Sequence, residues 1–173
     1  MLILRNVLFT LVLMSSCVHK ETQTNQTQQQ PSLLGSWKMT SVHWKSADTT
    51  YSIHQAQPGV FMIDEHRYAT MWTPIDQPRT PFKDLSAPTK EELVAGFRSV
   101  VFNSGTYEMT DSTLTTTALI AKVPGFEGGI QFYRYKIKGD SLALTMFDET
   151  YPDGEKPNWF GKYVSIFKYV RVK

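Results

Sequence analysis

The stretch Gly35-Ser36-Trp37-Lys38-Met39-Thr40-Ser41-Val42-His43-Trp44 alternates with a period of two residues. One face of this alternation carries Trp37, Met39, Ser41 and His43, and the other carries Lys38, Thr40, Val42 and Trp44. Successive side chains of a β-strand point to opposite faces of a sheet, whereas a helix repeats about every 3.6 residues. The stretch therefore predicts a β-strand that places a large aromatic side chain on one face of a sheet.

The two-residue period returns along most of the chain beyond this strand. Short polar turns such as Asp64-Glu65-His66, Asp111-Ser112 and Gly139-Asp140 separate the segments, and turns of this kind join antiparallel neighbours. The expected strands are residues 36–44, 49–55, 60–63, 67–72, 106–109, 113–121, 130–137, 142–146 and 162–172. Consecutive antiparallel strands of this number close most simply into a barrel, which removes exposed edges. The sequence predicts an all-β fold, an antiparallel meander β-barrel of eight or nine strands with one inserted α-helix.

The inserted helix follows a loop over residues 73–88 that contains four prolines. Thr89-Lys90-Glu91-Glu92 has the form of a capping box, which marks a helix N-terminus. Apolar side chains then recur at helical spacing, at Leu93, Phe97, Val100 and Val101. We expect this helix over residues 89–102 to lie over the open mouth of the barrel or against its wall, where it could gate a cavity.

The N-terminal residues predict export and a lipid anchor. A basic start, an apolar run over residues 7–13 and the small residues before Cys17 follow the order of a secretory signal peptide, and the run is too short to span a bilayer. Met14-Ser15-Ser16-Cys17 resembles the bacterial lipobox, which implies that Cys17 is lipidated; the alternative is a free cysteine after an uncleaved segment. We therefore expect a signal peptide over 1–16, a lipidated cysteine and disordered tether over 17–32 and a barrel domain over 33–173, anchored by lipid to a membrane of the bacterial cell envelope.

The charge balance and the motifs exclude several classes of function. Loss of Arg5 with the signal peptide lowers the formal net charge from +2 to +1, whereas nucleic-acid binding usually needs a clear basic excess. One cysteine cannot form a disulfide within the chain. The histidines, His19, His43, His54 and His66, have no zinc-binding spacing. We expect no metal, no cofactor and no nucleic acid.

An ordered set of short motifs resembles the lipocalin-like proteins of bacteria. Gly35-Ser36-Trp37 is similar to the Gly-x-Trp that opens the first strand of lipocalins, and it is followed by Tyr68-Ala69-Thr70-Met71, Gly105-Thr106-Tyr107 and the Gly-Asp-Ser-Leu-Ala-Leu hairpin of residues 139–144. The resemblance implies a barrel over about residues 33–172 whose base is closed by Trp37. It also implies an arginine packed across that tryptophan, for which Arg171 is the candidate by position.

Aromatic side chains make up 13% of the chain, and several fall on faces expected to point inward. An apolar cavity with a few hydrogen-bonding tips is the usual form of a ligand pocket. The candidate ligand-binding residues for a small hydrophobic molecule are Trp37, Met39, His43, Tyr68, Trp72, Phe97, Tyr107, Tyr133 and Tyr135. The alternative is a barrel filled by these side chains.

Three functions stay open at this point. The first is a lipid-anchored protein that binds a small apolar or amphipathic molecule. The second is an enzyme of the lipocalin-like type, acting as an isomerase, cyclase or hydratase on a lipophilic substrate, which would need an acid–base pair such as His43 with Glu108 or Arg134 inside the barrel. The third is an envelope interaction module with a filled barrel. We expect Asp148 and Glu149 to be solvated in a polar loop.

Overall fold

The computed structural model describes residues 32–173. The expected signal peptide over 1–16, the Cys17 anchor and the tether up to residue 31 lie outside the described residues. Within the described part of the chain, no helix is both long enough and apolar enough to cross a membrane.

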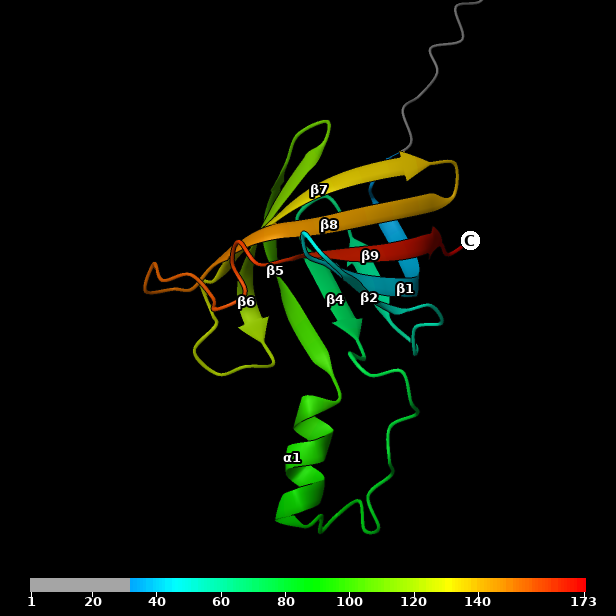
Figure 1. Cartoon of the computed structure of the whole chain (residues 1–173), viewed down its shortest axis with the longest axis vertical. Helices are drawn as coiled ribbons and strands as arrows, with labels where there is room; N and C mark the ends of the chain where they lie inside the picture. The colour runs from blue at the N-terminus through cyan, green and yellow to red at the C-terminus, as the bar shows by residue number, and fades with distance from the viewer. Residues whose placement is uncertain (1–31) are drawn as a thin grey trace, which may run out of the picture. The chain divides into compact units, whose positions relative to one another are not determined.

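Nine strands form one antiparallel sheet in the order β2-β1-β3-β4-β5-β6-β7-β8-β9, and β1 also pairs with β9. This last pairing closes a barrel of eight strands, while β2 continues the edge of β1 beyond β3 (Figure 1). The expected all-β meander barrel with one inserted helix is therefore confirmed. The strands are β1 (Gly35–Lys45), β2 (Thr50–Ile53), β3 (Val60–Ile63), β4 (Tyr68–Trp72), β5 (Val101–Met109), β6 (Thr113–Ala121), β7 (Ile130–Lys138), β8 (Ser141–Thr150) and β9 (Val164–Arg171), and the helix is α1 (Lys90–Arg98).

Two strands are longer than the sequence predicts. β5 begins at Val101 instead of residue 106, because its first residues pair with β4 and Val101 lies opposite Trp72. β8 continues to Thr150, into the segment that the sequence predicts as a polar loop, because Glu149 pairs with Gln131 of β7. Both extensions lie at the end of the barrel where β4 ends and β5 begins, which we call the open end.

The other end, where β1 begins and β9 ends, is closed as the family resemblance implies. Trp37 is 0% exposed, and its indole N–H donates a hydrogen bond to the carbonyl oxygen of Leu33 at 2.8 Å. The guanidinium of Arg171 lies over the indole, 4.0 Å from the ring centroid, and donates to the carbonyl oxygens of Leu34 and Ser32. The expected arginine across the tryptophan is thus confirmed, and it ties the last strand to the first.

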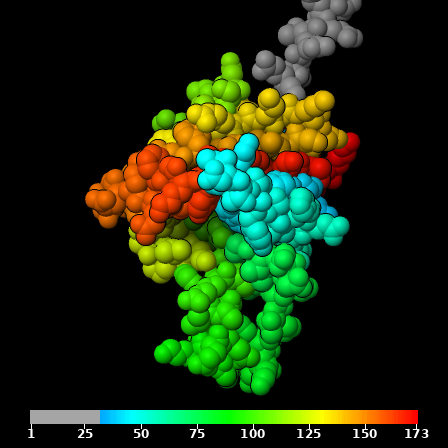
Figure 2. All heavy atoms as spheres, viewed as in Figure 1, coloured from blue at the N-terminus to red at the C-terminus, as the bar shows by residue number. Residues whose placement is uncertain are grey.

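Helix α1 does not cover the barrel, so this expectation is wrong. Its capping box between Thr89 and Glu92 is present, but the helix ends at Arg98 and contains no buried residue. Leu93 and Phe97 are 53% and 47% exposed. Figures 1 and 2 show the helix and its lead-in projecting away from the barrel beyond β4 and β5. The apolar stripe of the helix is too short to dock on the barrel, because Val101, which the sequence assigns to this stripe, belongs to β5.

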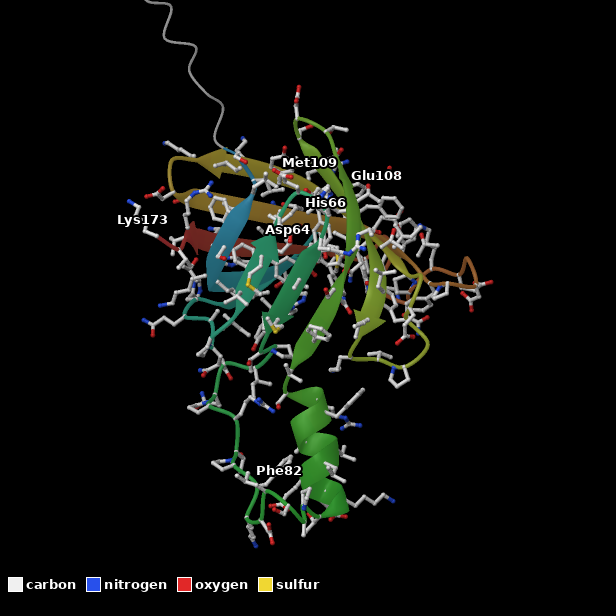
Figure 3. All side chains as sticks on the ribbon, turned by 180° about the vertical axis from the view of Figure 1, so that it is seen from behind. Asp64, His66, Phe82, Glu108, Met109 and Lys173 are labelled. Atoms are coloured by element: carbon white, nitrogen blue, oxygen red, sulfur yellow. The ribbon has the colours of Figure 1, made fainter. Side chains whose placement is uncertain are left out.

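The helix packs mainly on its own proline-rich lead-in. The ring of Phe82 lies so close to Gly96 that a methyl group there would stand 2.8 Å from it (Figure 3). The carboxylate of Glu92 accepts a hydrogen bond from the backbone N–H of Lys83 at 2.9 Å. Gly96 therefore allows the close approach of the Phe82 ring, and the lead-in is fastened to the helix it precedes.

Three β-bulges interrupt the ladders of the barrel. The register shifts at Thr40 in the pairing of β1 with β9, at Leu119 in that of β6 with β5, and at Phe147 in that of β8 with β7. An extra residue in one strand shifts by one the alternation of its side chains between the two faces. These bulges decide which polar side chains enter the barrel.

Candidate functional site

A cavity of about 200 Å³ lies inside the barrel toward its open end. Six aromatic side chains line its wall, because the inward positions of strands β3, β4, β7 and β9 carry large rings. These rings belong to Phe61, Tyr68, Trp72, Tyr133, Phe167 and Tyr169. The rings contact one another at the rim, where Trp72 meets Phe167 edge-on at 5.2 Å between centroids. The cavity is therefore a small, mainly apolar space with hydroxyl tips.

A hydrogen-bonded polar group forms one side of the cavity. Gln131 stands at its centre: its amide oxygen accepts from the side-chain N–H of Asn103 at 3.3 Å and from the hydroxyl of Tyr133 at 2.9 Å. Its amide N–H donates to the carboxylate of Glu149 at 2.6 Å. All four side chains are buried, so this wall brings an ionisable carboxyl group to the inside of the barrel.

Glu149 reaches this position because of the bulge at Phe147. Leu142, Leu144 and Met146 point inward, and uninterrupted alternation would bring Asp148 in next. The extra residue instead turns Asp148 outward, where it pairs with Lys156 at 2.7 Å, and Glu149 inward at 9% exposure. The expectation that Glu149 is solvated in a loop is wrong.

Burial controls the ionisation of the cavity walls. Desolvation raises the pKa of the Glu149 carboxyl, and the hydrogen bonds from Gln131 and from the Trp159 side chain only partly oppose this shift. Desolvation likewise raises the pKa of Tyr133 and of Tyr169, so both hydroxyls stay protonated at neutral pH. Among residues 32–173, the hydroxyl oxygen of Thr116, which is 1% exposed and lines the cavity, has no hydrogen-bond partner of good geometry, although it lies near the hydroxyls of Tyr68 and Tyr133.

A second, wider pocket of about 590 Å³ opens beside the cavity at the open end. The two spaces share the side chains of Val101, Asn103, Gln131 and Glu149. The β6–β7 and β8–β9 loops complete the outer pocket, and Phe126 of one meets Tyr151 of the other edge-on. The polar group thus forms the boundary between the inner cavity and the outside.

The structure brings three of the predicted ligand-binding residues into the cavity wall, namely Tyr68, Trp72 and Tyr133. Trp37 and Met39 are buried in the core at the closed end. Tyr107 and Tyr135 pack against the core, but their hydroxyls donate to the carbonyl oxygens of Asp64 and Thr110 in the turns of the closed end. Phe97 lies on α1, where Lys122 stands over its ring at 4.3 Å.

His43 faces the outside of the barrel, contrary to its predicted position on the face of Trp37. After the bulge at Thr40, Val42 and Trp44 take the inward positions, since Val42 lies opposite the inward Phe167. The imidazole of His43 forms hydrogen bonds with the hydroxyls of Ser41 and Ser52, at 3.0 and 2.7 Å. Desolvation lowers the pKa of His43, and the nearby Lys168 contributes to this shift.

The acid–base pair that an enzyme would need is not formed from the predicted residues. His43 faces outward, Glu108 is exposed near the end of β5 far from α1 (Figure 3), and Arg134 stacks over Phe147 on the outer face. Among residues 32–173, no three histidine, cysteine, aspartate or glutamate side chains are grouped to hold a metal ion.

Sequence reasoning missed several cavity residues, among them Asn103, Thr116, Gln131, Glu149, Phe167 and Tyr169. One signal for the polar wall was available, because Gln131 has the same inward parity as Tyr133 and Tyr135 on β7. A long polar side chain at an inward position of a barrel strand needs a buried partner. The partner, Glu149, could not be identified from the sequence, because the bulge in β8 is what turns its side chain inward.

Comparison with protein families gives a match to the lipocalin-like domain over residues 34–163, which is more than half of the chain. No curated protein matches the chain.

Proposed function

Because the chain belongs to the lipocalin-like domain family, we propose that it binds a small apolar or amphipathic molecule in its barrel. The observation that carries the proposal is the inner cavity, which is lined by six aromatic side chains and, on one side, by the polar group of Asn103, Gln131 and Glu149. Ligand pockets generally combine an apolar wall with a few placed polar groups.

The size of the cavity restricts the ligand. Pockets for drug-sized molecules occupy about 300–1,000 Å³, whereas a dry cavity of about 150 Å³ holds benzene. The inner space, at about 200 Å³, therefore accepts a single small ring or a short chain. A longer ligand would extend past Glu149 into the outer pocket of about 590 Å³.

Binding can be tested with 2-phenylethanol, a small neutral aromatic molecule, by calorimetry and by the change in tryptophan fluorescence, since Trp72 lines the cavity. We expect saturable binding to the wild type and loss of binding in Val101→Trp, because Val101 borders both spaces. Phe102→Trp is the matched control, since Phe102 lines only the outer pocket. Absence of saturable binding to the wild type, or equal binding by Val101→Trp, would overturn the proposal.

The same proposal includes lipid anchoring through Cys17 in the bacterial cell envelope. It is supported by the signal-peptide pattern before Cys17. Cys17→Ser should move the protein from the membrane fraction to the soluble fraction with an unchanged melting temperature. Membrane retention of Cys17→Ser would contradict the anchor.

A further inference from the structure

Within residues 32–173, Glu149 is a buried carboxyl group without a cationic partner. The ion pairs in this part of the chain are Lys156 with Asp148 and Lys173 with Asp140, and neither involves Glu149. Its hydrogen-bonding neighbours, Gln131 and the Trp159 side chain, are neutral. A buried carboxyl group is normally either paired with a cation or kept protonated, so a cationic ligand would supply the partner that the described residues do not.

Two lysines, Lys122 and Lys156, are engaged by other groups. Lys122 lines the outer pocket, but its ammonium group donates to the carbonyl oxygen of Phe97 at 2.9 Å and stands over that ring. Lys156 donates to both carboxylate oxygens of Asp148 and to the hydroxyl of Thr150. Neither side chain is free to neutralise Glu149.

The hydrogen-bond network leaves acceptors for a ligand. The amide oxygen of Gln131 accepts from Asn103 and from Tyr133, which fixes the amide so that its N–H group points to Glu149. A carboxylate offers about four acceptor positions on its two oxygens, and Gln131 and the Trp159 side chain occupy two of them. A ligand that approaches Glu149 from the cavity is therefore recognised through its hydrogen-bond donors.

The aromatic wall favours a positive charge for an independent reason. The faces of aromatic rings carry negative partial charge and attract ammonium groups within about 6 Å. Six aromatic rings, including those of Trp72, Phe167 and Tyr169, line the same small cavity as Glu149. A carboxylate and several aromatic rings around one space are the two elements that hold an organic ammonium ion.

We propose that the ligand of this barrel is an organic cation, a protonated amine on a small apolar body. Its ammonium group binds Glu149 at the boundary of the two spaces, and its apolar body lies against the aromatic wall of the inner cavity. This inference rests on the proposed binding function and specifies the chemical class of the ligand.

The test compares two probes of nearly identical shape, 2-phenylethylamine, which is cationic at pH 7, and 2-phenylethanol, which is neutral. Calorimetry should show that the wild type binds the amine at least about tenfold more tightly, a difference of about 1.4 kcal/mol. Binding of the alcohol as tightly as the amine would overturn the inference and leave the proposed binding function intact. Absence of binding of both probes would overturn both.

Two variants locate the source of the preference. Glu149→Gln keeps an acceptor for Gln131 and removes the charge, so its preference for the amine should fall to within about twofold. Asp148→Asn removes a charge from the neighbouring residue, which faces outward and pairs with Lys156, and should keep the wild-type preference. An amine preference that survives in Glu149→Gln would overturn the inference. If Glu149→Gln does not fold, the two probes on the wild type decide alone.

Discussion

Replacement of Trp37 by alanine tests the closed end of the barrel, on which the rest of the fold depends. The indole is fully buried, donates a hydrogen bond to the carbonyl oxygen of Leu33 and supports the guanidinium of Arg171 at 4.0 Å. It also lies between two neighbours in the closing sheet, since Trp37 pairs with Phe61 of β3 and with Arg171 of β9. Truncation therefore removes packing, a hydrogen bond and a cation–π contact at the point where the barrel closes.

The size of the effect follows from these contacts. Truncation of a buried tryptophan to alanine destabilises a protein by about 3–5 kcal/mol. The carbonyl of Leu33 loses its donor, which adds about 1–3 kcal/mol if the carbonyl stays buried, and the loss of the arginine contact adds about 0.5–1 kcal/mol. These contributions overlap, so we expect a loss of at least about 4 kcal/mol, a large part of the about 5–15 kcal/mol that stabilises a typical domain.

The assay is urea unfolding followed by far-ultraviolet circular dichroism, which does not depend on the tryptophan that is removed. Trp44→Ala is the matched control, because Trp44 lies on the same strand but is only half-buried, between the rings of Tyr51 and Trp72. We expect a loss of about 1–2 kcal/mol for this variant. A loss below about 1 kcal/mol for Trp37→Ala, or one no larger than that for Trp44→Ala, would refute the assigned role of Trp37.

Two further predictions concern Glu149 and α1. Because burial raises the pKa of Glu149 in the folded state, ionisation of this carboxyl group opposes folding. In urea unfolding, the wild type should be as stable as Glu149→Gln below about pH 4 and less stable than this variant as the pH rises to 7. A difference in stability between the two proteins that does not change with pH would contradict this prediction. Phe97→Ala should lower the free energy of unfolding by less than about 1 kcal/mol and leave the binding of 2-phenylethanol unchanged, because Phe97 lies on a helix without buried residues. Weaker binding of 2-phenylethanol by this variant would instead support a gating role for the helix.

The strands and turns of this barrel could be predicted because their signals are local. The strand predicted over residues 113–121 has the same bounds as β6. The Gly139-Asp140 turn joins β7 to β8 with Gly139 at φ +56°, a left-handed conformation that glycine adopts without steric cost. The position of Arg171 over Trp37 followed from the family resemblance, and the geometry agrees with it.

The position of α1 could not be predicted from the sequence. An apolar stripe indicates that one face of a helix packs against something, but it does not identify the surface on which that face packs. The second half of the predicted stripe is taken by the barrel, since Val101 pairs with Trp72 as the first residue of β5. What remains, chiefly Leu93 and Phe97, is short and largely exposed. The contact of Phe82 with Gly96 then fastens the lead-in to the helix and not to the barrel.

The two largest errors at the site, His43 and Glu149, both involve a bulge: counting alternate residues across one puts His43 on the wrong face, whereas Glu149 is predicted in a loop and reaches the cavity because β8 continues through the other. Counting alternate residues from a known inward position assigns faces correctly only until the first bulge, and the bulges at Thr40 and Phe147 lie between the anchoring residues and these two side chains. Neither bulge carries a glycine or proline that would mark it in the sequence. Each arises from the register with another strand, the distant β9 for Thr40 and the neighbouring β7 for Phe147, and not from the residues of the bulge itself. Bulges are over-represented at barrel rims and beside functional sites, so the alternation of side chains is least reliable close to such sites. In this barrel, the bulge at Phe147 decides that Glu149, and not Asp148 with its partner Lys156, faces the cavity.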